Sequence, residues 1–258
     1  MNATQEKFTR QTITHLHTWT PSLFSFRCTR DAGFRFTAGQ FARLGVRKAS
    51  GSIVWRGYSM VSSPFDEFLE FFSIVVPGGE FTSELSQLAV GDEILIEKQA
   101  HGFLTLDRFV DGEHLWLLST GTGVAPFLSM LQDFSAWERF QKIILVYSVR
   151  TQAELAYAEL LDEILTREYV AEYAHKFTFV PVVTRDAVPG CLGARITDLL
   201  NSGELERVVG LPLEAEHSRV LLCGNPQMVE DCRMLLQKRD MQLSLTRKPG
   251  AVAVENYW

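Results

Sequence analysis

The 258-residue sequence has few of the features that mark secreted, membrane-spanning or metal-clustered proteins. The first 20 residues lack the apolar segment of a secretory signal. No run of 18 or more apolar residues occurs, so we expect no membrane-spanning helix. The four cysteines, at positions 28, 191, 223 and 232, lack Cys-x-x-Cys spacing, which disfavours a zinc ribbon or an iron–sulfur cluster. We therefore expect a cytoplasmic protein with reduced thiols and no metal of its own.

Basic residues do not dominate the chain either. Lys and Arg number 25 against 31 Asp and Glu, which gives a net charge of −6. This balance disfavours nonspecific nucleic-acid binding by the whole surface, although it does not exclude a local basic patch. Hydrophobic residues make up 46% and charged residues 22%, as in ordinary globular proteins, and the length suits one large domain or two smaller ones.

The two halves of the chain differ in their pattern. Up to about residue 100, short stretches rich in aromatic and β-branched residues, such as 68–76, alternate with turns, which predicts an antiparallel barrel or sandwich. One short helix is expected at 82–90. From about residue 112, strands and helices alternate, which predicts a parallel sheet. Its strands are expected at 115–118, 142–150, 176–185 and 219–224, and its later helices at 154–165 and 226–239. The predicted domains are 1–108 and 109–258.

The segment LWLLSTGTGVAPFLSML, at 115–131, joins a buried strand to a helix through a glycine turn. Pro126 suits the first turn of that helix. Glycine lets backbone N–H groups approach a ligand closely, and a helix N-terminus favours an anion. A tight turn without a ligand is the alternative. Three other polar strand ends, SVR, VTR and CGNP, should lie at the same sheet edge, which favours a phosphate site.

Four motifs resemble those of the ferredoxin–NADP reductase family, and most closely its bacterial branch. They are RGYS at 56–59, STGTGVAPF at 119–127, CGNPQMV at 223–229 and the ending VENYW at 254–258. The match spans nearly the whole chain in the order of the family. It implies FAD on an antiparallel barrel and NADP(H) on a parallel-sheet α/β domain, with the two rings meeting at the interface.

The resemblance implies an FAD site on the barrel. Arg56 would neutralise the pyrophosphate, Tyr58 would stack on the isoalloxazine, and Ser59 would hydrogen-bond near flavin N5. The remaining implied FAD contacts are Gly57, Ile74, Val75, Val76, Phe81, Thr82, Ser83, Thr122 and Trp258, the last stacking on the adenine. An ordinary strand end at 56–59 and a plain helix cap at Thr82 or Ser83 are the alternatives.

The resemblance also implies an NADP(H) site on the α/β domain. Its residues are Thr120, Gly121, Gly123, Val149, Arg150, Arg185, Arg195, Cys223 and Gly224. The three arginines favour NADP(H) over NAD(H), because a 2′-phosphate needs cationic partners. Asp186, beside Arg185, weakens that argument slightly. Catalytic roles are implied for Ser59, for Cys223 near the nicotinamide, and for Glu255 in proton delivery, although a buried strand-end cysteine is usually structural.

The implied reaction is an exchange of hydride between NADP(H) and flavin N5, and of single electrons with ferredoxin or flavodoxin. Such partners are acidic, so we expect a basic patch on the barrel, with Arg27, Arg30, Arg35, Arg43 and Lys48 as candidates. We expect a monomer that binds neither nucleic acid nor membrane. The alternatives are an NAD(P)H:flavin reductase, an electron-relay flavoprotein subunit of a larger complex, and a ligand-binding protein without redox chemistry.

Overall fold

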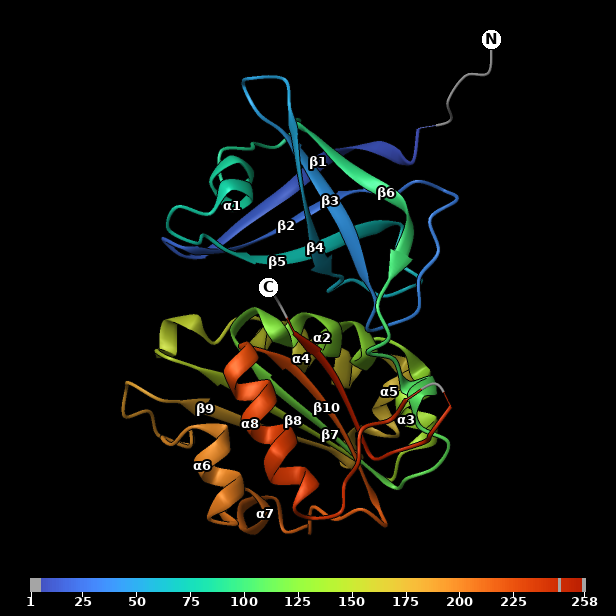
Figure 1. The fold of residues 1–258 in the computed structure, drawn as a ribbon, viewed down its shortest axis with the longest axis vertical. Coiled ribbons are helices and arrows are strands. Elements are labelled where there is room, and N and C mark those ends of the chain that lie inside the picture. The colour runs from blue at the N-terminus through green and yellow to red at the C-terminus, as the bar shows by residue number, and fades with distance from the viewer. Residues whose placement is uncertain (1–5, 246, 257–258) are drawn as a thin grey trace.

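An antiparallel sheet forms the N-terminal half of the protein (Figure 1). The computed structural model describes residues 6–245 and 247–256. The six strands are β1 (Phe8–Thr20), β2 (Leu23–Thr29), β3 (Phe41–Arg47), β4 (Ile53–Ser59), β5 (Phe68–Ile74) and β6 (Glu93–His101). They run in the order β4-β3-β6-β1-β2-β5, and an isolated bridge between Met60 and Phe71 joins the two ends of the sheet. The sheet therefore curls into the predicted antiparallel barrel.

The short helix α1 (Glu80–Leu85) covers one end of this barrel. The sequence predicted a short helix here, over 82–90, and both of the predicted bounds were wrong. The helix begins two residues earlier, after Gly79, and stops at Leu85, whose side chain is buried with that of Phe81 in the barrel core. The residues after it turn back toward β6, because the main chain of Gly91 hydrogen-bonds Ile13 on β1.

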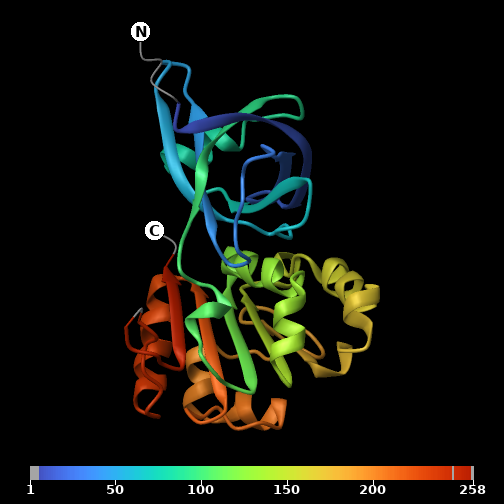
Figure 2. The same cartoon turned by 90° about the vertical axis from the view of Figure 1, so that its right-hand side faces the viewer.

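A parallel sheet forms the C-terminal half of the protein, as predicted (Figure 2). Its strands are β7 (His114–Thr120), β8 (Lys142–Val149), β9 (Phe177–Val183), β10 (Ser218–Gly224) and β11 (Val252–Asn256). They lie in the order β11-β10-β7-β8-β9, with every neighbouring pair parallel. Strand β11 was not predicted. It pairs with β10 from Val220↔Val252 to Gly224↔Asn256, so the residues of the VENYW motif up to Asn256 belong to the sheet.

Helices cover both faces of the parallel sheet. On one face lie α2 (Ala125–Leu131), α3 (Phe134–Arg139), α4 (Ala158–Thr166) and α5 (Glu168–Ala171), and on the other α6 (Ile196–Asn201), α7 (Glu204–Val209) and α8 (Pro226–Gln237). Short 3₁₀ turns are η1 (Leu106–Arg108), η2 (Gly121–Val124), η3 (Gln152–Glu154) and η4 (Ala174–Lys176). None of the described helices is both long and apolar enough to cross a lipid bilayer.

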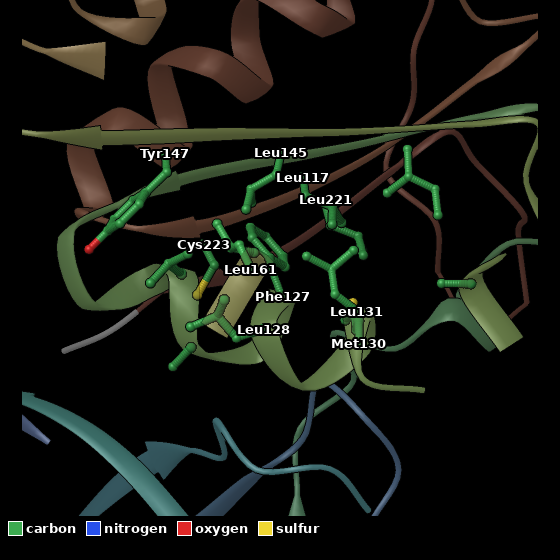
Figure 3. Packing of buried hydrophobic residues seen from close by; sticks show 14 of the residues in the cluster. Leu117, Phe127, Leu128, Met130, Leu131, Leu145, Tyr147, Leu161, Leu221 and Cys223 are labelled. Atoms are coloured by element: carbon green, nitrogen blue, oxygen red, sulfur yellow. The ribbon is translucent and has the colours of Figure 1, made fainter. Parts of the chain in front are cut away.

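The side chains of β7 alternate between two hydrophobic cores, as expected of a strand buried on both faces. Leu117 points to the layer of α2, where it packs with Phe127 and Leu131 (Figure 3). Trp116 and Leu118 point to the opposite layer, which contains α6 and α8. The helix predicted from Pro126 is α2, in which Pro126 occupies the first turn. The sheet therefore holds its strand ends rigidly at the edge that carries the polar motifs.

The helix predicted over 154–165 begins later than its pattern suggests. Residues 152–154 form η3, and Tyr157 adopts a left-handed conformation with φ of 65° before α4 starts at Ala158. This conformation lets the Tyr157 ring pack against Trp19 of β1 and Phe72 of β5, with ring centroids 5.0 and 5.1 Å away. Contact with the barrel thus overrides the local helical preference.

The two halves are joined by hydrogen bonds as well as by aromatic packing. At the end of α2, the Gln132 side chain donates to the carbonyl oxygen of Val61 at 2.7 Å, and the Ser129 hydroxyl donates to that of Ser62 at 2.8 Å. These groups are buried, so they fix how the barrel sits on the strand ends. The predicted boundary near residue 108 falls in η1, between β6 and β7, and stays a prediction.

Candidate functional site

A cavity of about 580 Å³ lies where the barrel meets the carboxyl edge of the parallel sheet. The barrel supplies most of its lining, and the α/β half supplies Thr122 after β7 and the last two described residues, Glu255 and Asn256. In Figure 1 the dark red strand that carries Glu255 runs up toward the barrel. The cavity thus joins residues that are about 200 positions apart in the sequence.

Most of the residues predicted for the flavin side line this cavity. They are Arg56, Gly57, Tyr58, Ser59, Ile74, Val76, Phe81, Thr82, Thr122 and Glu255. Among the described residues predicted there, Val75 and Ser83 do not line it. The Val75 main-chain N–H is already used, because it donates to Ser22. Trp258, predicted to stack on an adenine, lies outside the described residues.

Several residues of the cavity wall were not predicted as part of it. They are Phe41, Arg43, Phe72, Ser73, Gly79, Glu80 and Asn256. On β3, Phe41 is opposite Ser59 and Arg43 is opposite Gly57. Side chains two positions apart on a strand point to the same face of the sheet. If β3 is known to pair with the RGYS strand, Phe41 and Arg43 are therefore expected on the same face, next to the cavity. Asn256 directly follows Glu255, which was predicted for the site, and it ends β11.

Tyr58 forms the aromatic centre of the barrel wall. Its hydroxyl hydrogen-bonds the Ser73 hydroxyl on β5 at 2.9 Å, and its ring lies 5.4 Å from that of Phe81. Burial raises the pKa of the Tyr58 phenol to about 12, and the Ser73 hydrogen bond opposes this only in part. Tyr58 is therefore neutral at physiological pH and presents a fixed, flat surface to the cavity.

Thr82 is held by the turn that precedes α1. Its hydroxyl oxygen accepts a hydrogen bond from the Val76 main-chain N–H at 3.0 Å. The residue before the helix is Gly79, which provides no side-chain cap. The plain alternative for Thr82 or Ser83, a side-chain cap at the helix start, is therefore wrong. The role of Thr82 in the structure is to close the turn from Val76 to Gly79 at the edge of the cavity.

Ser59 and Glu255 meet across the junction of the two halves. The Ser59 hydroxyl donates to Oε2 of Glu255 at 3.3 Å, and Ser59 itself is buried. Burial raises the pKa of the Glu255 carboxyl to about 7, against a smaller lowering by the Ser59 hydrogen bond. The pair therefore forms a proton-holding group that titrates near neutral pH inside the cavity.

The glycines of STGTG and CGNP allow two strand ends to lie in contact. A Cβ atom on Gly123 would collide with the main chain of Cys223, and one on Gly224 would collide with Thr120. Gly224 also has φ of 135°, which side chains rarely adopt. The Thr120 hydroxyl accepts a hydrogen bond from the Asn225 main chain at 2.8 Å. The first role of these glycines is thus close packing, which leaves Thr122 beside the cavity.

Cys223 ends β10 as a fully buried residue. Its side chain lies in the hydrophobic layer between the sheet and α2, with Leu128 nearby (Figure 3). Cys223 does not line the cavity itself, although its main chain touches Gly123 and its neighbour in the register is Glu255 on β11.

The arginines predicted for phosphates lie at the ends of neighbouring strands. Arg150 follows β8 and Arg185 follows β9, and the main-chain N–H of Arg185 donates to the carbonyl oxygen of Arg150 at 2.8 Å. Arg195 precedes α6, in a segment that pairs with the end of β9 through Leu192. Val149 ends β8 and is buried. These residues lie outside the lining of the cavity.

Arg150 is engaged by Glu154. The Glu154 carboxylate accepts from Nε and NH2 of Arg150, the latter at 2.6 Å, and from the Arg150 main-chain N–H at 3.0 Å. Burial acts to raise the pKa of the Glu154 carboxyl, but the hydrogen bonds from Arg150 outweigh it and lower that pKa. Glu154 is therefore charged at neutral pH.

The five basic residues suggested as a docking patch do not gather at the cavity. Only Arg43 lines it, paired with Glu97 at 2.8 Å. Lys48 pairs with Glu80, and Arg27 pairs with Glu70 away from the cavity. Arg30 and Arg35 donate to main-chain carbonyl groups of nearby loops. Counting basic residues in the sequence therefore also selected side chains that form contacts within the barrel.

Comparison with known protein families defines the class of protein. Residues 13–102 match the model of an oxidoreductase FAD-binding domain, and residues 117–234 match that of an oxidoreductase NAD-binding domain. The protein is thus a two-domain flavin- and nicotinamide-dependent oxidoreductase, with the barrel and the parallel sheet as its two cofactor domains.

Individual relatives narrow the class to a family. The chain is 40% identical over 247 residues to a ferredoxin–NADP reductase of Pseudomonas aeruginosa, covering 94% of this chain and 95% of that one. It is 41% identical over 247 residues to a flavodoxin/ferredoxin–NADP reductase of Escherichia coli, covering 95% and 97%. The crystal structure of a ferredoxin NADP⁺ reductase from Neisseria gonorrhoeae with bound FAD and NADP superposes with a TM-score of 0.91 at 37% identity, covering 98% of this chain and 100% of that one. The chain belongs to the ferredoxin–NADP reductase family.

Proposed function

We propose that this enzyme exchanges hydride with NADP(H) and single electrons with a ferredoxin or a flavodoxin, and that it uses bound FAD to do so. The observation that carries the proposal is the cavity in which Ser59, Thr122 and Glu255 meet from both halves of the chain. Bound FAD supplies the conversion between electron pairs and single electrons. The protein supplies the binding, the alignment and the control of protons.

The cavity fits FAD in its chemistry. Its volume of about 580 Å³ lies in the range of small-molecule sites. Tyr58 and Phe72 present aromatic surfaces on which a flat ring system packs, and the exposed Arg56 guanidinium on the rim suits a pyrophosphate. We assign to the same cofactor Gly57, Ile74, Val75, Val76, Phe81, Thr82 and Ser83.

The proposed reacting end of the site is where Ser59 meets Glu255. The Ser59 hydroxyl donates to Oε2 of Glu255, and the carboxyl gains or loses a proton near pH 7. A proton held by this carboxyl would be available to the redox chemistry that FAD supplies. Cys223 acts through position: its buried side chain and its contact with Gly123 fix the strand ends on which a nicotinamide would lie.

The proposed NADP(H) site continues from Thr120 and Gly121 to the ends of β8 and β9. Arg150, Arg185 and Arg195 provide three guanidinium groups for its phosphates, of which the 2′-phosphate distinguishes NADP(H) from NAD(H). A carboxylate that binds the ribose would instead favour NAD(H). Asp186 is only partly available for such a contact, because its Oδ2 accepts a hydrogen bond from the Gln152 main-chain N–H at 2.8 Å.

The proposed protein partner is an acidic ferredoxin or flavodoxin that approaches the rim of the cavity. Arg43 and Arg56 are the cations on that rim. We also propose a monomeric enzyme of the cytoplasm, where Cys28, Cys191 and Cys232, which are free thiols, would stay reduced.

The test is a visible spectrum of the purified protein under anaerobic conditions, before and after addition of NADPH. We expect flavin bands that bleach rapidly with NADPH and slowly with NADH. A yellow protein that NADPH does not bleach would refute the nicotinamide assignment. A colourless protein that binds no added FAD would refute the whole proposal. Loss of FAD on gel filtration would instead identify a reductase that treats flavin as a substrate.

A further inference from the structure

The carboxylate of Glu154 is placed among groups that should bind phosphate. Its side chain is only 17% exposed, and it takes up the Nε and NH2 edge of the Arg150 guanidinium together with the Arg150 main-chain N–H. The main chain of Glu154, at the end of η3, is held as well, because the buried Tyr147 hydroxyl donates to its carbonyl oxygen at 3.2 Å. This contact is therefore built into the strand end and is not a chance surface pair.

The two other arginines of this region differ from Arg150. The side chains of Arg185 and Arg195 are exposed. Within residues 6–245 and 247–256, neither of these two guanidinium groups forms a hydrogen bond or an ion pair, and only the main chain of Arg185 is bonded to Arg150. One of the three cations is therefore neutralised by a carboxylate, while two remain uncompensated. The imbalance does not follow from a shortage of carboxylates, since Asp186 is adjacent to Arg185 and instead caps the Gln152 main chain.

We propose that Glu154 is a specificity-determining residue that limits the preference of this enzyme for NADP(H) over NAD(H). The inference rests on the proposed function, in which Arg150, Arg185 and Arg195 bind the phosphates of NADP(H), and it places Arg150 beside the 2′-phosphate. A dianion near Arg150 interacts with an ion pair whose net charge is zero, so it gains less Coulomb energy than beside a lone guanidinium. Glu154 keeps Arg150 in place while it restricts the affinity for the phosphorylated nucleotide, and so favours release of NADP⁺.

The opposite role for Glu154 predicts the opposite result. If Glu154 served chiefly to hold Arg150 ready for the phosphate, its removal would weaken binding of the phosphorylated nucleotide. Glutamine at this position separates the two roles, because its amide oxygen can still accept from the Arg150 main-chain N–H while the negative charge is lost. The charge effect should dominate, since the ligand carries nearly two negative charges.

The test is titration calorimetry of the FAD-loaded Glu154→Gln enzyme with 2′-phospho-AMP and with AMP. We expect 2′-phospho-AMP to bind about three- to tenfold more tightly than to the unmodified enzyme, with a steeper dependence on salt, and AMP to bind unchanged. The matched control is Glu163→Gln. It removes a carboxylate of α4 that pairs with Arg167 at 2.9 Å, and it should change neither affinity. Circular dichroism and the flavin spectrum verify that each variant is folded.

Unchanged or weaker binding of 2′-phospho-AMP by Glu154→Gln would overturn the inference. Arg185→Ala, measured in the same titrations, separates this failure from failure of the proposed function. If Arg185→Ala loses the preference for 2′-phospho-AMP over AMP while Glu154→Gln has no effect, only the role of Glu154 is wrong. If Arg185→Ala also keeps the full preference, the assignment of the 2′-phosphate to Arg185 in the proposed function is wrong as well.

Discussion

The hydroxyl of Ser59 and the carboxyl of Glu255 are 196 residues apart in the chain and 3.3 Å apart in the structure. Ser59 ends β4 of the barrel, whereas Glu255 lies on β11 of the parallel sheet. Their hydrogen bond therefore exists only when both sheets are formed and docked. It places a titrating group where the proposed reaction requires one.

Glu255 should make the stability of the protein depend on pH. Its pKa is raised by burial from 4.5 to about 7, so the folded protein holds this proton more tightly than the unfolded chain does. The free energy of unfolding should therefore fall as pH rises from about 4.5 to about 7, by on the order of 3 kcal/mol. Glu255→Gln should lack this loss and should be more stable than the unmodified protein at pH 8.

Urea denaturation at pH 5 and pH 8 measures this effect. Glu138→Gln, which changes an exposed carboxylate on α3, is the control and should follow the unmodified protein. If Glu255→Gln and the unmodified protein lost stability in parallel between these pH values, Glu255 would titrate in its ordinary range.

Arg185→Ala should weaken NADPH much more than NADH. Loss of a charge-assisted hydrogen bond to the 2′-phosphate costs about 1.5–3 kcal/mol, or roughly 10- to 100-fold in KM for NADPH. Steady-state kinetics with both nucleotides provide the measurement. Arg207→Ala, at an arginine on α7 whose side chain is 72% exposed, should change neither KM. Equal losses for NADPH and NADH in Arg185→Ala would refute the assigned role.

Gly123→Ala should be more harmful than Gly121→Ala, although both glycines belong to one motif. A methyl group at Gly123 meets the Cys223 main chain, which cannot move without disturbing β10, so we expect a cost of about 2–3 kcal/mol. A methyl group at Gly121 meets nothing within 4 Å, and only its φ of 53° costs about 1 kcal/mol. Urea denaturation compares the two, and equal losses would mean that close packing is not the role of Gly123.

Tyr157→Phe should loosen the contact between the two halves. The Tyr157 hydroxyl donates to Oε1 of the buried Glu70 at 2.9 Å, and phenylalanine keeps the ring while leaving that oxygen without this donor. We expect a loss of about 1–3 kcal/mol in the free energy of unfolding. Tyr169→Phe, where the residue is 43% exposed, should cost less than about 0.5 kcal/mol. Similar values for the two variants would contradict the role of Tyr157.

Local sequence patterns were sufficient for the elements that bury a continuous apolar face. The runs that became β7, β8 and β10 were identified because a strand covered on both faces is dominated by apolar residues, and β9, at the edge of the sheet, was identified from the alternation of strands with helices. The helix expected over 226–239 is α8, which starts at Pro226 as expected, ends at Gln237 and is capped by the side chain of Asn225. The family motifs then indicated the correct class of cofactor domains.

The remaining features depend on contacts that no local pattern records. Strand β11 has only five residues, and its partner β10 lies about 30 residues earlier, so its pairing is set by the sheet. The start of α4 is set by packing of Tyr157 on Trp19 and Phe72. Phe41 and Arg43 line the cavity because of the register of β3 against β4, and register requires a known partner strand.

The shared lining of the cavity has a thermodynamic consequence. A ligand that touches the barrel wall and also Thr122, Glu255 and Asn256 can bind only while the two sheets are docked. Its binding free energy therefore adds to the stability of the interface and of both halves at once, by mass action. Flavin occupancy should thus raise the unfolding temperature of both halves together, and the cofactor links the two sheets of the fold as well as serving the reaction.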